Sequence, residues 1–572
     1  MTFPERALAA ERSLITEPLT ELARSHPGLW RLDSAGVTPL GRPLQALVHA
    51  DAYDLNSRRL RVLMLGGITG RQADVRTAHA VLAGYAADSR LRGHIALSGV
   101  AVANPEALSL ATDGMNSAGG VVDGGFPPEG GYFNDPVAPE ARYLWRWILF
   151  QAPDLVIDLR SGSAETLEVN AAVSGLGATR RVQADHTLVH ALGEARQPDP
   201  GAVPAIRLTV PADGGQSLDG VWSMLGRLKA GRSGAGEALH RRQRRSAGEV
   251  ASTLARRYGD RLEPVVYTQG VAISGRLRVA QHTGDVAPVE AARRLVEPYV
   301  SGARPPFSER AGGQDLAGVV WCEELLALTG DDRYRDLMVK AADRFGASDV
   351  QAPPPPADPD FRTEDMFFVA AVLGRAYRMT ERRRYSELLA GYMHLCARRQ
   401  QEDGLFWHGE SVPRYWGRGN AFAALGFAEA LTYLPGDTAG RDGLVATHRS
   451  HLESIIATAA PSGMLRQVLD VRGSYEELSA TCMTGYALAR GIRLGWLSRA
   501  LFGGPLERLW KASLARVDSN GDLVDVCTGT GPQPSLGAYL NRTALSGYDD
   551  RGGSLASWFA AEMLALATGD GR

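Results

Sequence analysis

A short motif that returns at regular intervals in the second half of the chain constrains the fold most. It reads Thr283-Gly284-Asp285, then Thr329-Gly330-Asp331, and then Thr380-Glu381-Arg382 in the equivalent place, 46 and 51 residues apart. Each copy follows one amphipathic segment and precedes another, as with residues 317–328 and 333–345. Repeated helical hairpins bury their apolar faces against their neighbours. We therefore expect the second half to be all α-helical.

The length of this region favours a closed arrangement of hairpins. From residue 237 onward about 335 residues remain, and six hairpins of roughly 50 residues need about 300. An (α/α)6 toroid fits, and an open solenoid is the alternative. Long Gly-rich connections favour the toroid, because such loops suit the crowded mouth of a barrel. These connections are residues 404–420, 462–477 and 527–553.

The first half alternates continuous apolar runs with helical stretches. The runs are residues 61–65, 94–97, 100–103, 154–159 and 205–210. Such runs, bounded by Gly and Pro, indicate buried strands of a mostly parallel sheet. We expect an α/β domain over residues 1–236, with a mixed sheet and flanking helices, and the helical domain over residues 237–572. The Gly- and Ser-containing stretch 229–236 is the candidate boundary.

Composition excludes several classes of partner. The 572 residues carry 62 Lys and Arg against 64 Asp and Glu, a net charge of −2, so no positive field favours nucleic acid or an acidic membrane surface. No apolar run of about 18 residues predicts a membrane span. The first residues lack the layout of a secretory signal, which favours the cytoplasm. The oligomeric state stays open, a homo-oligomer included.

The four cysteines are far apart in the sequence and form no CxxC pair. They are Cys322, Cys396, Cys482 and Cys527. We expect buried free thiols rather than a disulfide framework or a zinc site.

Residues 15–215 resemble the zinc carboxypeptidase and succinylglutamate desuccinylase family. The matching segments are Leu40-Gly41-Arg42-Pro43-Leu44, Leu65-Gly66-Gly67-Ile68-Thr69-Gly70 and Asp158-Leu159-Arg160-Ser161-Gly162. The family's zinc ligands fall at Thr69, Gln72 and Arg160, whose side chains cannot form a three-ligand zinc site. No metal and no peptidase activity are therefore expected. This domain is a retired scaffold, or Arg160 binds an anionic group where the metal would sit.

Residues able to carry chemistry concentrate in the second half. Thr363-Glu364-Asp365-Met366-Phe367-Phe368 opens a helix, with Thr363 as the expected N-cap and acids in the first turn. Further on, Tyr415-Trp416-Gly417-Arg418-Gly419-Asn420 places Trp and Arg between glycines. Trp offers a stacking face for a sugar, and Arg offers a fork for a carboxylate. This combination indicates a site for an acidic sugar.

From about residue 237 onward the chain resembles family 105 glycoside hydrolases, the unsaturated rhamnogalacturonyl hydrolases, which are related to the unsaturated glucuronyl hydrolases of family 88. The matching segments are Tyr267-Thr268-Gln269-Gly270, the Glu-Asp-Met-Phe block at 364–367, Trp416-Gly417-Arg418-Gly419-Asn420, Gln467-Val468-Leu469-Asp470, Ser474-Tyr475-Glu476-Glu477 and Tyr486-Ala487-Leu488-Ala489-Arg490-Gly491. They extend over essentially the whole helical domain.

The resemblance implies a reaction and roles for six residues. The substrate carries a terminal 4,5-unsaturated uronic acid; an acid protonates C4, water adds at C5, and the hemiketal collapses to release the aglycone. It implies Asp365 as the acid and base, which must be protonated near neutral pH. Asp315 is the candidate second carboxylate, with a helix cap as the alternative. The implied substrate-binding residues are Tyr267, His408, Trp416 and Arg418.

The resemblance also has departures and leaves rival functions. Where the family often carries Trp-His-Lys before the catalytic helix, residues 351–359 are proline-rich. Asp549-Asp550-Arg551 is a late loop that enters the site or an internally paired turn. No cofactor or metal is implied, and an acidic oligosaccharide is the expected partner. The alternatives are a hydrolase of saturated glucuronides or other acidic sugars on the same fold and a non-catalytic carbohydrate-binding or assembly protein.

Overall fold

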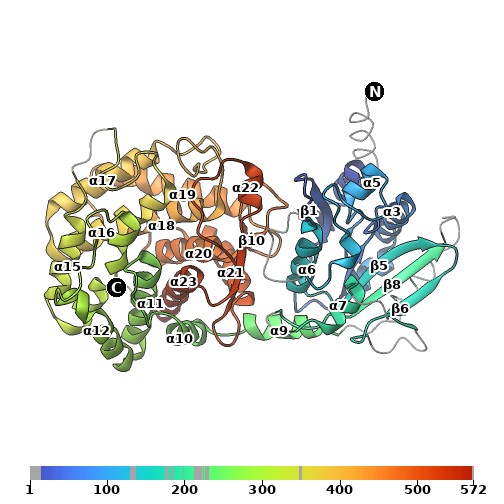
Figure 1. Cartoon of the computed structure of the whole chain (residues 1–572), viewed down its shortest axis with the longest axis horizontal. Coiled ribbons are helices and arrows are strands. Elements are labelled where there is room, and N and C mark those ends of the chain that lie inside the picture. Colours follow the sequence, from blue (N-terminus) through green and yellow to red (C-terminus); the bar gives the residue numbers. More distant parts are fainter. Residues whose placement is uncertain are drawn as a thin grey trace. The chain divides into compact units, whose positions relative to one another are not determined.

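The computed structural model describes residues 15–128, 137–173, 180–182, 186–196, 199–211, 222, 225, 231–346 and 351–569. The chain divides into two compact units, whose elements are labelled in Figure 1. Unit 1 comprises Met1–Gln243 with Val471–Tyr475 and Leu540–Thr543, and unit 2 comprises the remaining residues. The boundary expected after residue 236 falls within helix α9 (Gly234–Gln243). Residues 229 and 230 of the expected linker lie outside the described residues.

Unit 1 contains a mixed sheet with the strand order β1-β2-β4-β3-β5-β8-β6-β7. The strands are β1 (Trp30–Val37), β2 (Pro43–His49), β3 (Leu60–Leu65), β4 (Ile95–Val100), β5 (Leu155–Gly162), β6 (Thr166–Val169), β7 (Arg180–Arg181) and β8 (Ala205–Pro211). The central strands β4, β3, β5 and β8 are parallel, whereas β1, β2 and β6 pair antiparallel. The apolar runs predicted these central strands, because strands buried on both faces lose the polar alternation of edge strands.

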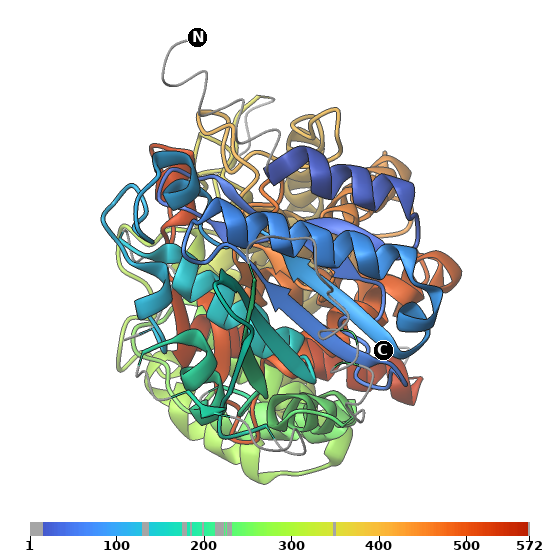
Figure 2. The same cartoon turned by 90° about the vertical axis from the view of Figure 1, so that its right-hand side faces the viewer.

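Helices cover this sheet. They are α2 (Glu17–Ser25), α3 (Gln72–Ala87), α4 (Ser89–His94), α5 (Pro105–Leu110), α6 (Pro139–Gln151), α7 (Leu188–Glu194) and α9, with the 3-10 turn η2 (Val122–Gly124). Figure 2 shows the blue helices α2 and α3 lying over the strands. Apolar side chains of α3 and of β3, β4 and β5 form one core, so the sheet is stabilised by burial against these helices.

Unit 2 is built of helical hairpins. Its helices are α10 (Ala247–Arg257), α11 (Tyr267–Thr283), α12 (Ala287–Val300), α13 (Gly313–Leu316), η3 (Ala317–Val319), α14 (Cys322–Thr329), α15 (Arg333–Ala342), α16 (Thr363–Thr380), α17 (Arg383–Ala397), α18 (Gly417–Tyr433), α19 (Arg441–Ala457), α20 (Leu478–Arg493), α21 (Arg499–Ala515), α22 (Leu536–Leu540) and α23 (Asp550–Thr568). Short strand pairs β9 (Leu465–Arg466) with β10 (Glu476–Glu477), and β11 (Leu523–Cys527) with β12 (Ala544–Gly547), interrupt them. The prediction of a helical second half is confirmed.

The order in which the helices of unit 2 pack gives a ring. Among the described residues, α11, α14, α16, α18, α20 and α23 form an inner set, in which neighbours contact one another directly or, between α14 and α16, through α15. The last inner helix, α23, packs on the first, α11. Helices α10, α12, α15, α17, α19 and α21 each pack on an inner neighbour. Inner helices such as α18 are buried on almost every side, as their many apolar and small residues require.

The repeated motif ends inner helices by one local mechanism. Gly284, Gly330 and Glu381 have φ values of 71°, 70° and 57°, the left-handed conformation that terminates a helix. The preceding threonine donates its hydroxyl to a carbonyl one turn back and accepts the N–H two residues on, as Thr329 does with Leu325 and Asp331. At the end of α23, Thr568 donates its hydroxyl to the carbonyl of Leu564, and Gly569 has a φ of 70°, so this helix ends with the same pair of residue types.

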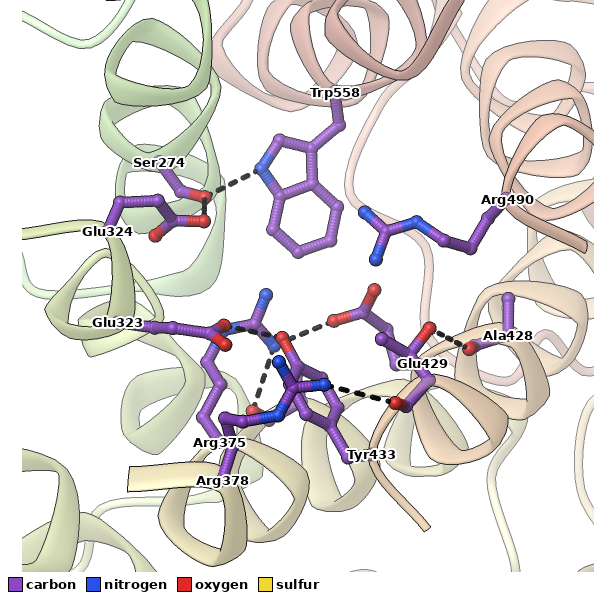
Figure 3. A network of polar contacts seen from close by, with 12 residues as sticks. Ser274, Glu323, Glu324, Arg375, Arg378, Ala428, Glu429, Tyr433, Arg490 and Trp558 are labelled. Carbon is purple, nitrogen blue, oxygen red and sulfur yellow. Dashed lines mark hydrogen bonds and ion pairs between the residues drawn. The ribbon is translucent and has the colours of Figure 1, made fainter. Parts of the chain in front are cut away.

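A belt of buried charged groups joins the inner helices (Figure 3). Arg375 donates to Glu429 at 2.6 Å, and Glu429 accepts from the hydroxyl of Tyr486 at 2.7 Å. Further pairs link other inner helices: Arg278 with Glu324, Tyr433 with Glu323, and Arg490 and Arg493 with Glu562. Burial alone would raise the pKa of Glu429, but Arg375, Arg490 and Arg278 hold it at about 2. Glu429 therefore stays ionised although it is fully buried.

Two further expectations can be compared with the described residues. All four cysteines are buried and free, so that prediction is confirmed. Among the helices described here, none combines the length and the apolar character needed to cross a bilayer.

Candidate active site

A cavity of about 770 Å³ opens at one end of the helices of unit 2. Its walls come from the N-terminal ends of α11, α13, α16 and α18, the start of α23, and the loop at residues 529–531. Helix N-termini carry partial positive charge, so a cavity where several of them meet suits an anionic ligand. Five of the six residues expected at the site line this cavity: Tyr267, Asp315, Asp365, Trp416 and Arg418.

Asp365 is a buried carboxyl group in the cavity wall. It is the third residue of α16 and only 7% exposed, and its Oδ2 accepts the main-chain N–H of Asp358 at 2.9 Å. Burial raises the pKa of Asp365 to about 7, and the charges of Glu364 and Asp358 add to this rise, against the opposing effects of the Asp358 N–H and Arg362. Near neutral pH this carboxyl can both donate and accept a proton.

The proline-rich loop and a glycine hold Asp365 in place. Pro356, Asp358 and Pro359 line the cavity, so the segment that departs from the family pattern forms part of its wall. On another side lies Gly313, where an added Cβ would come within 2.9 Å of Oδ1 of Asp365. The carboxyl group therefore fits closely between two loops. Thr363, the expected N-cap, is instead the first helical residue of α16.

Asp315 both lines the cavity and caps a helix. It lines the cavity, and its Oδ2 accepts the main-chain N–H of Gly312 at 3.0 Å at the start of α13. The cap role is thus observed, and a catalytic role stays a prediction.

His408 is placed differently from the expectation that it contacts the sugar. It is fully buried and does not line the cavity. Its Nε2 lies 3.1 Å from Oε1 of Glu364, and its Nδ1 lies within hydrogen-bond distance of the hydroxyl of Tyr539. His408 therefore reaches the cavity through Glu364, because the loop that carries it passes behind the start of α16.

Trp416 and Arg418 line the cavity but are each only 1% exposed. The Trp416 ring centroid lies 4.3 Å from that of His408, and the guanidinium of Arg418 lies 4.9 Å from the Trp416 ring. Little of this ring is left for the expected sugar stacking. Arg418 donates to the main-chain carbonyls of Cys527 and Thr528, so the fork expected to bind a carboxylate is bound to the protein chain.

Other residues of the cavity had no assigned role. Arg310, Arg362 and Glu364 line it, and Arg551 joins them from α23. Both expectations for residues 549–551 hold for Arg551. Its side chain lines the cavity, and its Nη1 also lies 3.6 Å from Asp549. Tyr267 packs on Phe368 and Phe422, with ring centroids 5.0 and 5.8 Å away, and burial raises its pKa. Charged residues in loops carry no periodic signal, so only their position in the fold identifies them.

The residues of unit 1 at the positions of zinc ligands do not fit a metal. The hydroxyl of Thr69 donates to Asp74 at 2.6 Å, and the guanidinium of Arg160 is paired with Asp158 at 2.6 Å and Asp123 at 2.9 Å. A cation already bound by two carboxylates neither coordinates zinc nor presents an open anion site. Among the described residues, no group of three His, Cys, Asp or Glu side chains is arranged to hold a metal ion.

Several solved structures align with more than half of this chain. A family 105 glycoside hydrolase from C. acetobutylicum is 17% identical, with a TM-score of 0.50 over 55% of this chain and 99% of that one. A possible family 105 member from Salmonella enterica serovar Paratyphi A is 17% identical, with a TM-score of 0.49 over 56% and 94%. The unsaturated glucuronyl hydrolase of Bacillus sp. GL1 is 18% identical, with a TM-score of 0.44 over 57% and 96%.

The curated relatives match over a short stretch. Protein Atu3128 of Agrobacterium fabrum and the 24.9 kDa protein in the picA locus of Rhizobium radiobacter are each 40% identical over 88 residues, 15% of this chain. The chain spans 37% of the length of these relatives. Residues 243–567, more than half of the chain, match the family model described as Glycosyl Hydrolase Family 88. The chain therefore belongs to Glycosyl Hydrolase Family 88, and unit 2, which contains almost all of the matched residues, is its glycoside hydrolase part.

Proposed function

We propose that unit 2 removes a terminal 4,5-unsaturated uronic acid, galacturonyl or glucuronyl, from the end of an oligosaccharide. The observation that carries this proposal is the carboxyl group of Asp365, buried in the cavity wall with a pKa of about 7. Hydration of a C4=C5 double bond needs an acid for C4 and then a base for the attacking water. One carboxyl group that is partly protonated near neutral pH can serve as both.

The steps follow from this single group. Asp365 gives its proton to C4, and positive charge develops at C5 beside the ring oxygen. The Asp365 carboxylate then takes a proton from water as the water oxygen bonds to C5. The resulting hemiketal opens and releases the aglycone without direct attack on the glycosidic bond, so no second carboxylate has to face that bond.

The charges of the cavity support an acidic sugar. Arg310, Arg362 and Arg551 line it together with helix N-termini, and guanidinium groups bind carboxylates well. Arg418 lies at the same wall, held by two main-chain carbonyls, and supports the loop at residues 527–531. We propose that the uronate carboxylate faces these arginines. We also propose that Tyr267 and Trp416 form the walls on either side of the sugar ring.

A second candidate is hydrolysis of saturated glucuronides or related acidic sugars. The observation that favours it is that Asp315 and Glu364 line the same cavity as Asp365, which provides the second carboxyl group that such a reaction requires.

For unit 1, we infer a metal-free relative of the zinc carboxypeptidases, with residues 1–236 as the evolutionary domain. Support comes from the mixed sheet and from the salt bridges of Arg160, where the family would hold its metal. For unit 2, the ring of packed helices supports the (α/α)6 toroid expected over residues 237–572.

The test compares matched unsaturated and saturated disaccharides with wild-type protein and Asp365→Asn. Turnover of an unsaturated uronide is followed by the loss of its ultraviolet absorbance. We expect wild-type turnover of the unsaturated substrate alone and none by folded Asp365→Asn. Full activity of Asp365→Asn would refute the role of Asp365, and turnover of saturated substrates alone would favour the second candidate.

A further inference from the structure

Glu364, the residue before Asp365, is fixed by a chain of buried groups. It lines the cavity with a side chain that is 17% exposed. Its Oε1 lies 3.1 Å from Nε2 of His408, and its Oε2 accepts the hydroxyl of Thr363 at 3.3 Å. His408 and Tyr539, which stand behind it, are both fully buried.

The hydrogen-bond partners determine where the protons lie along this chain. The hydroxyl of Tyr539 accepts the main-chain N–H of Gln533 at 3.2 Å, which leaves its own proton available for donation to Nδ1 of His408. His408 then carries its ring proton on Nε2 and donates it to Glu364. In the other tautomer, an unprotonated Nε2 would face a carboxylate. In this first tautomer every group of the chain has a hydrogen-bond partner.

The other groups around Asp365 compensate one another or are neutral. In the adjoining loop, Asp358 is paired with Arg362 at 2.8 Å. On α17, which packs against α16, Tyr392 and Cys396 face Asp365, and burial raises the pKa of both, so both are neutral. Across the cavity, Asp315 caps α13, and Arg310, Arg418, Arg551 and Tyr267 complete the walls. Glu364 is therefore the adjacent carboxyl group that is bound by a buried histidine, whereas Asp358 is paired with an arginine.

We propose that Glu364, held by the Tyr539–His408 chain, is the positioning residue that keeps the Asp365 carboxyl group protonated for its role as an acid. This inference rests on the proposed function. It assigns to Glu364, rather than to Asp315, the task of the second carboxylate in the site. Glu364 acts through Asp365, because a fixed negative charge next to a carboxyl group disfavours a second one.

The test is the pH dependence of kcat for Glu364→Gln, which keeps an acceptor for His408 and removes the charge. If Asp365 must be protonated, activity falls as pH rises through its pKa. Loss of the neighbouring charge lowers that pKa, so this basic limb should move to lower pH by about one unit. Glu453→Gln removes the same charge from an exposed position on α19 and should leave the limb unchanged.

Two more variants separate charge from geometry. Tyr539→Phe keeps the Glu364 side chain but removes the hydrogen bond between Tyr539 and His408. This variant should lower kcat roughly five-fold, the equivalent of one hydrogen bond. The basic limb of its pH profile should stay at the wild-type pH. Should Glu364→Gln fold poorly in a thermal melt, Glu364→Met removes the charge at similar length. A limb that stays at the wild-type pH in folded Glu364→Gln or Glu364→Met overturns the proposal.

A substrate-free measurement distinguishes this inference from the proposed function. The infrared difference between wild-type protein and Asp365→Asn reports the carboxyl stretch of Asp365 as a function of pH. When Glu364 is replaced by Gln, the protonated signal should disappear at a lower pH than in wild-type protein. If wild-type protein hydrolyses no unsaturated uronide, the proposed function fails, while an infrared titration unaffected by Glu364→Gln makes the role of Glu364 itself wrong.

Discussion

The main-chain N–H of Asp358 donates to Oδ2 of Asp365 across 2.9 Å, so the proline-rich loop holds the buried carboxyl group directly. A main-chain donor cannot be removed by changing a side chain, apart from a change to proline. The loop thus contacts the acid through its main chain. Its side chains at Pro356 and Pro359 form cavity wall instead of polar contacts.

We expect Asp365→Asn to change how stability depends on pH. The native pKa of about 7 lies above the ordinary value of 3.8, so the native state keeps a proton that the unfolded chain releases between these values. The contribution of Asp365 to the free energy of unfolding of the wild-type protein is fully present below pH 3.8 and is lost as pH rises through 7. Asn does not ionise, so the variant should gain on the order of 3 kcal/mol over wild type by pH 8. Denaturant unfolding between pH 5 and 8.5 measures this, and a constant difference would contradict it.

Gly313→Ala should damage catalysis more than stability. The new Cβ would lie 2.9 Å from Oδ1 of Asp365 and 3.1 Å from Cβ of Phe368, so the carboxyl group must move. We expect kcat to fall more than about ten-fold, since small displacements of a reacting group are costly, with a stability loss of about 1 kcal/mol. Gly391→Ala in α17 meets no atom within 4 Å and is the matched control. Wild-type kcat in Gly313→Ala would show that the close fit of Asp365 is unimportant.

Local patterns made part of this structure predictable. The Thr-Gly-Asp motif predicted helix ends because a left-handed residue terminates a helix whatever the tertiary context. The position of Asp365 in a first helical turn was also local, and the inner helices bring such turns to one cavity. Apolar runs predicted the central strands of unit 1, whereas the antiparallel strands β1 and β2 lack such a pattern.

Contacts between distant segments were not predictable. Arg418 donates hydrogen bonds to the main-chain carbonyls of Cys527 and Thr528, which lie more than a hundred residues further along the chain. His408 is turned away from the cavity by Tyr539, and nothing near either residue in the sequence records this pairing. A residue type fixes the chemistry that a side chain can perform, but the fold decides which partner receives it.

Unit 1 should bind no zinc and should depend on Arg160 for stability. Asp158 is fully buried between Arg160 and Arg207, which outweigh burial and hold the pKa of Asp158 below its ordinary value. Arg160→Ala removes one partner and should cost about 3 kcal/mol, as breaking a buried ion pair does. Because the pKa of Asp158 is lowered, its ion pair with Arg160 contributes fully to stability above pH 3.8. This contribution is lost as pH falls below that value. Metal analysis that finds stoichiometric zinc in purified wild-type protein would refute the metal-free assignment.

The buried pair of Arg375 and Glu429 should be strongly coupled in stability. Both side chains are inaccessible to solvent and lie 2.6 Å apart, so Arg375→Met leaves an ionised group inside the core. We expect a loss of about 3–5 kcal/mol for the single variant and a smaller loss for the double variant with Glu429→Leu than the sum of the two singles. The exposed pair of Arg293 and Glu290 is the control, where Arg293→Met should leave stability nearly unchanged.

The pH dependence of this belt has the opposite sign to that of Asp365. Because Glu429 has a pKa of about 2 against an ordinary 4.5, its contribution is present above pH 4.5 and is lost as pH falls through 2. Unfolding measured from pH 5 down to pH 2 should therefore show a steeper loss for wild type than for Glu429→Gln. Equal slopes would mean that other carboxylates govern acid unfolding. If the losses of the Arg375 and Glu429 single variants simply add in the double variant, the two charges are not coupled.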